Sequence, residues 1–397
     1  MSKIRDFIKS RKEESADSEY DDKLRKHKIK KFRRYAIIVG IVVVVAIFVF
    51  LYIENRTNSE YEVESNIMTG DTTKCMFYEY GKGFLRYSND GLAYIEGSDS
   101  IWNQAFEMKT PMIDICKNYV AFAEQNTNEI YIYNTEGLVG KVKTSYPVIN
   151  LEVAANGVVA AITEETNANH IEIIDTDGTI LVTGQTVLSG DGCPVDLSLS
   201  EDATKLIVSY LYLNGGVTQT KVVFYNYSEV GKIEVDRVVG GFNQYKSTIV
   251  PRVEFITNDI AVAVGDDMYT IYADKQKPSI LAEEKIDKEI KSIFYSEVYI
   301  GFIFETGEID TPYELKIINT SGDILYEGAI EIDYRNIKFD GDNVILYDQD
   351  TFIVMTVKGK VKFKGNIGSQ INEVIALGGK YKYIRIATES IDIVRLK

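Results

Sequence analysis

The sequence predicts an all-β protein, a β-propeller of four-stranded blades preceded by one transmembrane α-helix. Three observations lead to this prediction. A single long apolar run lies near the N-terminus, at 36–53. From residue 74 onward, short alternating strands follow one another with turn residues between them. The same four-strand pattern then recurs every 40–50 residues or so, which is the period of a propeller blade.

Composition limits the classes of partner. The 397 residues carry a net charge of −15, and 45% of them are apolar, which is enough for a sizeable core. Residues 1–35 hold 13 Lys/Arg and 7 Asp/Glu, a balance of +6, so subtracting it from −15 leaves −21 for the remainder. An outer region this acidic disfavours nucleic acid as a partner, because phosphates would be repelled.

The first segment, 1–35, is predicted to be a basic cytoplasmic tail. Its second half, Lys23–Arg34, packs eight basic residues beside the apolar run. Such a cluster is attracted to the anionic inner leaflet of a membrane, by about 1 kcal/mol for each basic residue near the surface. The alternative is that the tail docks a cytosolic protein.

The apolar run Ala36–Ile53 is predicted to be a transmembrane helix in contact with the lipid bilayer. Its 18 residues would span roughly 27 Å as a helix, close to the thickness of a bilayer core. Basic residues precede it and acidic residues follow it, so the N-terminus is expected in the cytoplasm and the C-terminal domain outside the cell membrane, as a single-pass protein. A cleaved signal peptide is the main alternative, but no small-x-small cleavage pattern follows the run.

A polar stalk is expected at 54–73, with one strand over Tyr61–Met68, and the extracytoplasmic propeller at 74–397. Turns of the form Asn/Asp-Thr-x-Gly recur at 134–137, 175–178 and 319–322, where Asn or Asp starts a turn and Gly supplies positive φ. Repeating units are predicted to begin near residues 74, 112, 148, 194, 250, 289, 335 and 371. This predicts eight blades, or seven if the first unit is irregular. The last unit has three strands, and the strand at 61–68 would complete it and close the ring.

The repeats over about 60–397 resemble the WD-repeat and quinoprotein-like propeller superfamily in period and hydrophobic texture, although the Gly-His and Trp-Asp signatures of the WD type are absent. With its anchor, the chain resembles an uncharacterised family of single-pass, membrane-anchored β-propeller proteins of Gram-positive bacteria. That resemblance implies a location in the cell envelope and no known reaction.

A search for chemistry finds no catalytic signature, so the protein is not expected to be an enzyme. Beyond the apolar run the sequence has one histidine, His170, which is too few for a Ser-His-Asp or Cys-His arrangement or a zinc site. The three cysteines, Cys75, Cys116 and Cys193, have no metal-ligand spacing, and whether they form a disulfide stays open. Trp102 is expected to pack between blades. We expect no metal and no cofactor.

One inter-blade loop is predicted to be a binding surface, because it combines aromatic and amide side chains next to two glycines. Its residues are Phe242, Asn243, Gln244, Tyr245 and Lys246. The leading hypothesis is a binding or scaffolding propeller whose partner is an envelope protein or a glycan. The alternatives are a glycan-active enzyme that uses paired carboxylates on the propeller face, or a transmembrane sensor.

Overall fold

The structure, a computed structural model of the chain, describes residues 27, 30–49, 52, 57, 59–68, 70, 72–368, 370–378 and 381–397. The chain divides into two units, Met1–Thr57 and Asn58–Lys397. The first unit contains a helix over Lys30–Val49, which is long and apolar enough to cross a membrane. The predicted cytoplasmic tail before residue 27, and residues 50, 51 and 53 of the predicted span, lie outside the described residues.

The helix starts six residues before the apolar run, since it continues back through the basic residues at 30–34. Within the described residues, the apolar side chains of this helix are exposed all round. An α-helix that is apolar all round is unfavourable in water, so this composition is typical of a membrane span or of a signal sequence.

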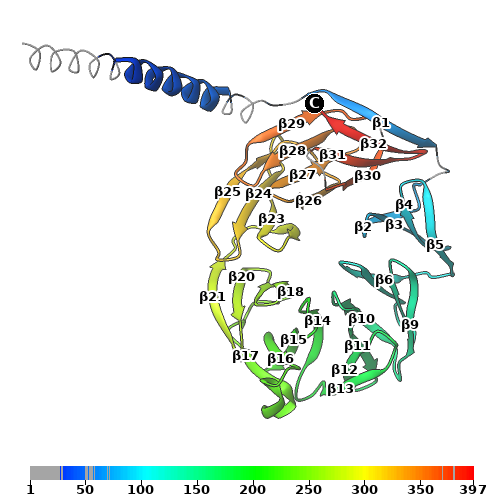
Figure 1. Ribbon diagram of the computed structural model, residues 1–397. Coiled ribbons are helices and arrows are strands. Elements are labelled where there is room, and N and C mark those ends of the chain that lie inside the picture. The colour runs from blue at the N-terminus through cyan, green and yellow to red at the C-terminus, as the bar shows by residue number, and fades with distance from the viewer. Residues whose placement is uncertain are drawn as a thin grey trace, which may run out of the picture. The chain divides into compact units, whose positions relative to one another are not determined.

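The second unit is a β-propeller of eight four-stranded antiparallel sheets arranged as blades around a ring (Figure 1). This confirms the predicted fold and the eight-blade count. Blade 1 consists of β2 (Met76–Tyr80), β3 (Gly83–Ser88), β4 (Gly91–Glu96) and β5 (Asp99–Ala105). Blade 2 consists of β6 (Pro111–Cys116), β7 (Tyr119–Glu124), β8 (Glu129–Asn134) and β9 (Gly137–Lys143). Blade 3 consists of β10 (Val148–Val153), β11 (Val159–Glu165), β12 (Ala168–Ile174) and β13 (Ile180–Val187).

The next blades follow the same order from the channel outward. Blade 4 consists of β14 (Cys193–Leu199), β15 (Lys205–Asn214), β16 (Val217–Asn226) and β17 (Val238–Phe242), with the 3-10 turns η1 (Gly231–Ile233) and η2 (Val235–Arg237) before β17. Blade 5 consists of β18 (Arg252–Thr257), β19 (Ile260–Val264), β20 (Met268–Asp274) and β21 (Pro278–Lys285). Blade 6 consists of β22 (Ile290–Tyr295), β23 (Tyr299–Glu305), β24 (Tyr313–Asn319) and β25 (Ile324–Ile330). Blade 7 consists of β26 (Asn336–Asp340), β27 (Asn343–Tyr347), β28 (Phe352–Thr356) and β29 (Val361–Gly365).

Blade 8 joins the two ends of the propeller. It consists of β30 (Ile371–Ala376), β31 (Lys382–Ala387), β32 (Ser390–Leu396) and, as its outermost strand, β1 (Tyr61–Met68). The strand expected at 61–68 is therefore present, and it pairs antiparallel with β32 from Tyr61↔Leu396 to Met68↔Ser390. Because this blade combines strands from both ends of the repeat region, the ring is closed by hydrogen bonds between strands more than 300 residues apart.

The outermost strands share a second feature, an extra residue that interrupts the pairing with the neighbouring strand. The pairing registers of β5, β9, β13, β17, β21, β25, β29 and β1 each skip one residue near the start of the strand. Such β-bulges bend and twist an exposed edge, which blunts it against pairing with another chain. Since β1 has the same bulge, it takes the place of an ordinary fourth strand.

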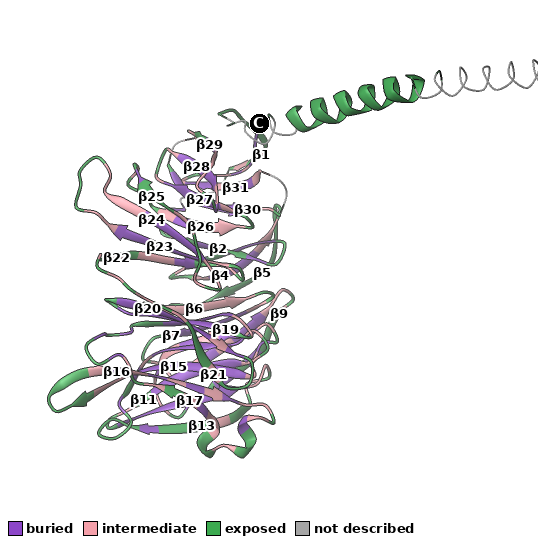
Figure 2. Cartoon of the chain, turned by 90° about the vertical axis from the view of Figure 1, so that its left-hand side faces the viewer, coloured by how far each residue is buried: buried purple, intermediate pink, exposed green. Residues whose placement is uncertain are grey.

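The core is divided between the blades. Eight buried apolar clusters are present, and each draws residues from two neighbouring blades, as the buried faces of the sheets in Figure 2 indicate. The cluster between blades 8 and 1 is the smallest, with five buried residues, whereas each of the others has nine or more. Because this apolar cluster is small, the closure of the ring depends strongly on the pairing of β1 with β32. The other contacts between blades depend less on strand pairing.

Candidate functional site in the central channel

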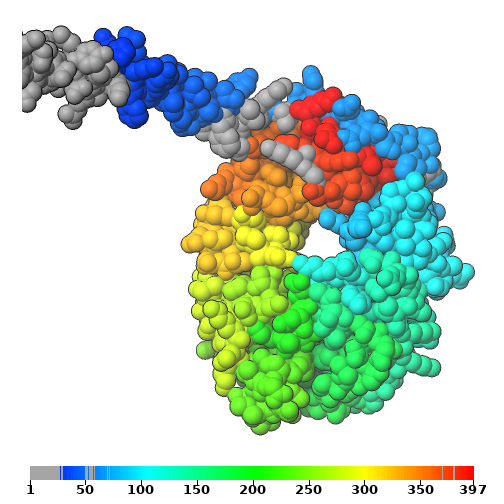
Figure 3. Space-filling model, in the orientation of Figure 1, coloured from blue at the N-terminus to red at the C-terminus, as the bar shows by residue number. Residues whose placement is uncertain are grey.

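The innermost strands surround a central opening, which is visible through the ring in the space-filling view (Figure 3). Four consecutive blades place one acidic side chain each on these strands, and three of the acids hold equivalent positions; on β14 the equivalent residue is Ser198, and the acid lies two residues before it. Asp114 lies on β6, Glu152 on β10, Asp196 on β14 and Glu254 on β18. Apolar residues flank each acid and belong to the clusters between blades. Because strand side chains alternate, the acids project away from those clusters.

Three of these carboxyls connect one blade to the next. Asp114 accepts a hydrogen bond from the backbone N–H of Val153 at 2.7 Å. Glu152 accepts one from Leu199 at 2.9 Å, and Asp196 one from Val253, also at 2.9 Å. Each bond thus satisfies a backbone donor on the free inner edge of the following blade. These three acids have a structural role, and both oxygens of Asp196 are engaged, since its Oδ1 also accepts a hydrogen bond from Asn150 Nδ2 at 3.0 Å.

Glu254 differs, since its partners are side chains, Arg252 on its own strand and Tyr295 on the next blade, and not a backbone donor. Its Oε2 lies 2.8 Å from Nη2 of Arg252, and the same nitrogen donates to the hydroxyl of Tyr295 on β22 at 3.2 Å. The Glu254 side chain is 12% exposed, while Arg252 is 45% exposed. The guanidinium thus lies at the open side of the acidic cluster.

A cavity of about 280 Å³ opens between these strands. Asp114, Glu152, Glu254 and Tyr295 line it, and the turns that follow the inner strands form its rim. At the rim, Lys117 Nζ lies 2.5 Å from Glu297 Oε1 and 3.4 Å from Glu201 Oε1. Within the described lining and its contacts, the acids therefore outnumber the two basic side chains, Lys117 and Arg252.

Burial and mutual repulsion change the titration of the cluster. Burial raises the pKa of Glu254 to about 7, although the positive charge of Arg252 lowers it. Burial also raises the pKa of Glu152 well above its usual range, and repulsion from Glu254 and Asp114 adds to the rise. The pKa values of Asp114 and Asp196 are raised by burial as well. Near neutral pH the cluster therefore retains protons that isolated carboxylates would release.

Metal binding finds no support in the geometry. Among the described residues, no three His, Cys, Asp or Glu side chains are grouped so that they could hold a metal ion. The channel cluster thus offers separate carboxyl oxygens rather than a coordination shell, an arrangement that suits an organic cation with several N–H donors.

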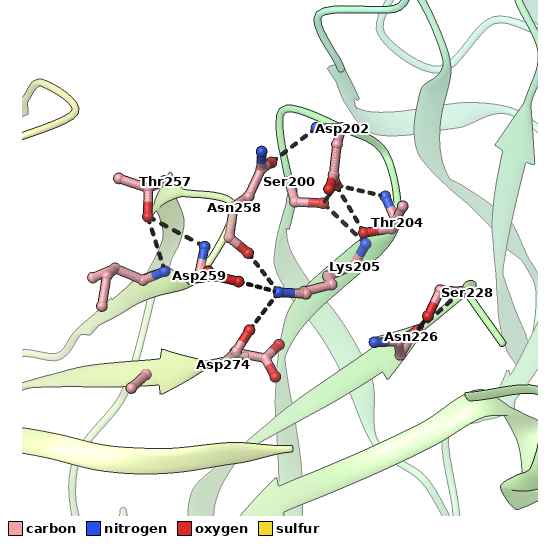
Figure 4. Close-up of polar contacts among 12 residues, drawn as sticks. Ser200, Asp202, Thr204, Lys205, Asn226, Ser228, Thr257, Asn258, Asp259 and Asp274 are labelled. Carbon is pink, nitrogen blue, oxygen red and sulfur yellow. Dashed lines mark hydrogen bonds and ion pairs between the residues drawn. The ribbon is translucent and has the colours of Figure 1, made fainter. Parts of the chain in front are cut away.

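A second polar cluster joins blades 4 and 5 near the turn after β18 (Figure 4). Lys205 Nζ donates to the carbonyl of Asn258 and to Asp259 Oδ1, both at 2.7 Å, and to the carbonyl of Asp274. The carboxyl oxygens of Asp274 are fully buried and have no hydrogen-bond partner among the described residues. Burial raises the pKa of Asp274, and the Lys205 charge opposes that rise. With all three ammonium donors used, this cluster serves as an inter-blade connection.

The loop predicted to bind a partner is largely part of the core. Phe242 packs against the cluster between blades 4 and 5, and Tyr245 is fully buried there, with its hydroxyl bonded to that of Tyr272. Gln244 is half-buried and lies 3.3 Å from Glu283. Only Asn243 and Lys246 are exposed. The loop folds back so that its two aromatic rings fill the seam between blades, and the predicted binding surface is reduced to its polar residues.

Other residues named from the sequence have ordinary structural places. Trp102 packs between blades 1 and 2, with its ring 4.9 Å from that of Tyr133, as expected. His170 stacks on Tyr146 and lies 3.0 Å from Glu165. Cys116 and Cys193 are free thiols. Burial raises the pKa of Cys116, which lines the channel cavity, to about 12, so this thiol stays protonated.

The channel acids were not singled out from the sequence, although a signal was available. The inner strands contain the triplets Ile-Asp-Ile, Leu-Glu-Val, Val-Asp-Leu and Val-Glu-Phe at 113–115, 151–153, 195–197 and 253–255. An acid between two apolar residues on the first strand of four successive repeats indicates carboxyls on neighbouring strands of one ring.

Comparisons with solved structures agree on the fold. The structure of BamB from Moraxella catarrhalis is similar with a TM-score of 0.54 at 11% identity, covering 85% of this chain and 98% of that one. The Dos1 propeller gives 0.52 at 11% identity, over 86% and 96% of the two chains. Sqt1 from Chaetomium thermophilum, in a structure bound to the N-terminus of the ribosomal protein L10, gives 0.50 at 8%, over 86% and 100%. At these identities the likeness shows the fold alone.

Sequence comparison is more specific. No curated protein matches the chain. One family profile, described as "Family of unknown function (DUF5711)", matches residues 54–396, which include every strand of the propeller. The protein therefore belongs to the DUF5711 family.

Proposed function

We propose that this protein is a membrane-anchored binding propeller, whose channel mouth takes the cationic side chain of a lysine or arginine from a protein partner in the cell envelope. The observation that carries the proposal is the excess of carboxyl groups over cations around the channel cavity. A propeller of the same fold, Sqt1, is bound to the N-terminus of another protein in its solved structure, which supports a binding role for such a ring.

A cation would relieve the repulsion within the cluster. Glu152 and Glu254 hold protons near neutral pH because burial and neighbouring acids disfavour their charged forms. An incoming ammonium or guanidinium group favours those charged forms, so it displaces protons as it binds. Binding should therefore strengthen as the pH rises through the pKa of Glu254.

The size of the cavity limits the ligand. About 280 Å³ lies just below the usual range for small-molecule pockets, which is roughly 300–1,000 Å³. One side-chain head group fits this space, while a folded partner would rest on the rim formed by Lys117, Glu201 and Glu297.

The proposal is tested by titrating the full-length protein in micelles with tetralysine, and with tetraglutamate as the reverse-charge probe. We expect tetralysine alone to bind, about tenfold more tightly at pH 8 than at pH 6, since Glu254 with a pKa of about 7 is mostly neutral at the lower pH. Glu254→Gln should remove most of this pH dependence.

The matched control is Glu229→Gln, which makes the same charge change at an 89% exposed side chain in the loop after β16. It should leave binding unchanged. If both variants weaken tetralysine equally, the attraction is a general effect of the acidic surface, and the proposed site is wrong.

The membrane anchor and its orientation belong to the same proposal. The apolar helix over Lys30–Val49 supports an anchor, and the basic residues before it support a cytoplasmic N-terminus with the propeller outside the cell membrane. Cys193 is exposed, whereas Cys75 and Cys116 are partly buried. A membrane-impermeant maleimide should therefore label the protein on intact cells, and Cys193→Ser should remove most of that labelling. Labelling only after lysis would mean that the propeller faces the cytoplasm, the reverse of the proposed orientation.

A glycan-active enzyme is the second candidate, and one observation favours it. A carboxyl with a pKa near 7 beside other carboxyls is what a general acid in a glycosidase needs. We favour binding, since Glu254 is held by Arg252 and the three other acids are engaged with backbone donors. The test is the release of reducing ends from oligosaccharides. If the wild type releases them and Glu254→Gln does not, the protein is a glycan-active enzyme.

A further inference from the structure

A second and larger cavity lies away from the channel, between blades 3 and 4. Its volume is about 570 Å³, which is within the range of small-molecule sites. β12 and β13 form one wall, and β15, β16 and the start of β17 form the other. None of its lining residues takes part in the channel cluster.

The cavity exists because one wall lacks side-chain volume. Gly184 on β13 faces open space, and a Cβ built there would meet only the carbonyl of Ile171, at 3.9 Å. Its neighbours on the same strand, Val182 and Thr186, are also small. The side chains of Tyr210, Tyr225 and Tyr227 line the facing wall.

The tyrosine wall combines flat apolar faces with hydroxyl groups. The hydroxyls of Tyr210 and Tyr225 are hydrogen-bonded to each other at 2.7 Å. Burial raises the pKa values of Tyr210, Tyr225 and Tyr227, so all three stay neutral and keep their O–H donors. Lys221 Nζ lies 5.3 Å from the centre of the Tyr210 ring, which holds its ammonium group at the wall.

The charges around the cavity balance. Asp191 and Asp236 are matched by Lys221 and Arg237 among the lining residues. Neither an anion nor a cation is therefore favoured by net charge. Hydroxyl-rich neutral molecules are favoured, because carboxylates, guanidinium and ammonium groups all form strong hydrogen bonds with hydroxyls.

The lip of the cavity is held in an unusual backbone conformation. Asp236 and Arg237 are consecutive non-glycine residues in the left-handed region, with φ of 52° and 63°. Residues in this strained conformation gather at ligand sites. The Arg237 guanidinium donates to the carbonyl of Tyr227 at 3.3 Å, which keeps it beside the tyrosine wall.

A buried amide next to the cavity lacks a partner. Asn169 is 1% exposed, and its Nδ2 makes no hydrogen bond within the part of the chain that the structure describes. It lies on β12 opposite Thr186 and two residues from Ile171, both of which line the cavity. A buried donor without a partner is unfavourable, and a ligand or ordered water in the cavity would satisfy it.

We propose that this cavity binds one or two rings of a neutral oligosaccharide. A sugar ring has an apolar C–H face, which would lie on the tyrosine rings, and a rim of hydroxyls, which would meet the balanced charged groups. The site is independent of the channel and does not rest on the cation-binding function proposed above.

The test uses the full-length protein in a detergent without a sugar head group, titrated calorimetrically with cellotetraose, maltotetraose and chitotetraose. We expect at least one of the three to bind. Gly184→Val, whose Cβ would be in ordinary contact with the Ile171 carbonyl, should weaken that binding at least tenfold. The matched control is Gly241→Val on β17, where an added Cβ meets nothing within 4 Å and which is outside the lining.

Two further variants keep the test decisive. Tyr227→Phe removes one hydroxyl and should weaken binding several-fold even if Gly184→Val does not fold. Glu254→Gln in the channel should leave sugar binding unchanged, so the two proposals can fail separately. If none of the three sugars binds, or if binding is the same in wild type, Gly184→Val and Tyr227→Phe, the cavity is only a packing gap and the proposal is overturned.

Discussion

Replacing Glu254 by glutamine should make the propeller more stable at alkaline pH. In the folded protein burial raises the pKa of this carboxyl from its usual 4.5 to about 7. Between these two values the unfolded chain releases the proton while the folded chain keeps it, so stability falls as the pH rises. At about 1.4 kcal/mol for each pH unit, the loss approaches 3 kcal/mol, and it is complete above the folded-state pKa. Glutamine does not titrate and therefore avoids the loss.

The assay is urea unfolding of the full-length protein between pH 4.5 and 8.5, followed by the fluorescence of Trp102, the chain's one tryptophan. We expect wild type and Glu254→Gln to be equally stable at pH 4.5, and the variant to lead by about 2–3 kcal/mol at pH 8. Glu229→Gln, at an exposed position, should follow the wild type throughout. A difference that does not change with pH, or a variant that is less stable at pH 8, would refute the reasoning.

Three other substitutions test the fold around the site. Phe84→Ala removes a 1% exposed ring from the small cluster between blades 8 and 1 and should lower the free energy of unfolding by about 3–5 kcal/mol. Limited proteolysis should then cut the variant first near β1. Cleavage elsewhere would contradict the inference that the contact between blades 8 and 1 is the weakest. Lys205→Met leaves the buried Asp274 without its counter-charge and should lower the free energy of unfolding, measured in urea, by about 3 kcal/mol. An unchanged unfolding midpoint would show that Asp274 is neutral in the folded protein. Tyr245→Ala should lower the free energy of unfolding by at least about 3 kcal/mol, whereas Lys246→Ala, at an exposed position, should change it by less than about 0.5 kcal/mol. Equal effects of the two substitutions would mean that the loop is not part of the core.

The architecture could be predicted because its signal is repeated. Turns of the Asn/Asp-Thr-x-Gly type mark the last hairpin of several blades, so an error in one unit is corrected by the next. The predicted unit starts at 148 and 371 coincide with the first residues of β10 and β30, and the others fall within two residues of theirs. The strand at 61–68 could be predicted because the last unit lacked one strand, and a ring has no other place for it.

The sites could not be predicted in the same way, for two physical reasons. The loop containing Phe242 and Tyr245 has the composition of a recognition loop, but whether an aromatic ring points outward depends on the space left between two blades, and composition does not report that space. The cavity beside Gly184 likewise depends on which tyrosines of the next blade face it. The channel acids are different, since their repeated triplets could have been aligned once the blades were located.

The most direct test of the channel proposal is the number of protons released when a cation binds. Titration of the protein with tetralysine at pH 6.5, repeated in two buffers with different ionisation enthalpies, gives that number. With a folded-state pKa of about 7, Glu254 should release about 0.7 proton, and Glu254→Gln should lower the total by that amount. Binding without proton release, or with the same release in the variant, would contradict a cation site at the channel mouth.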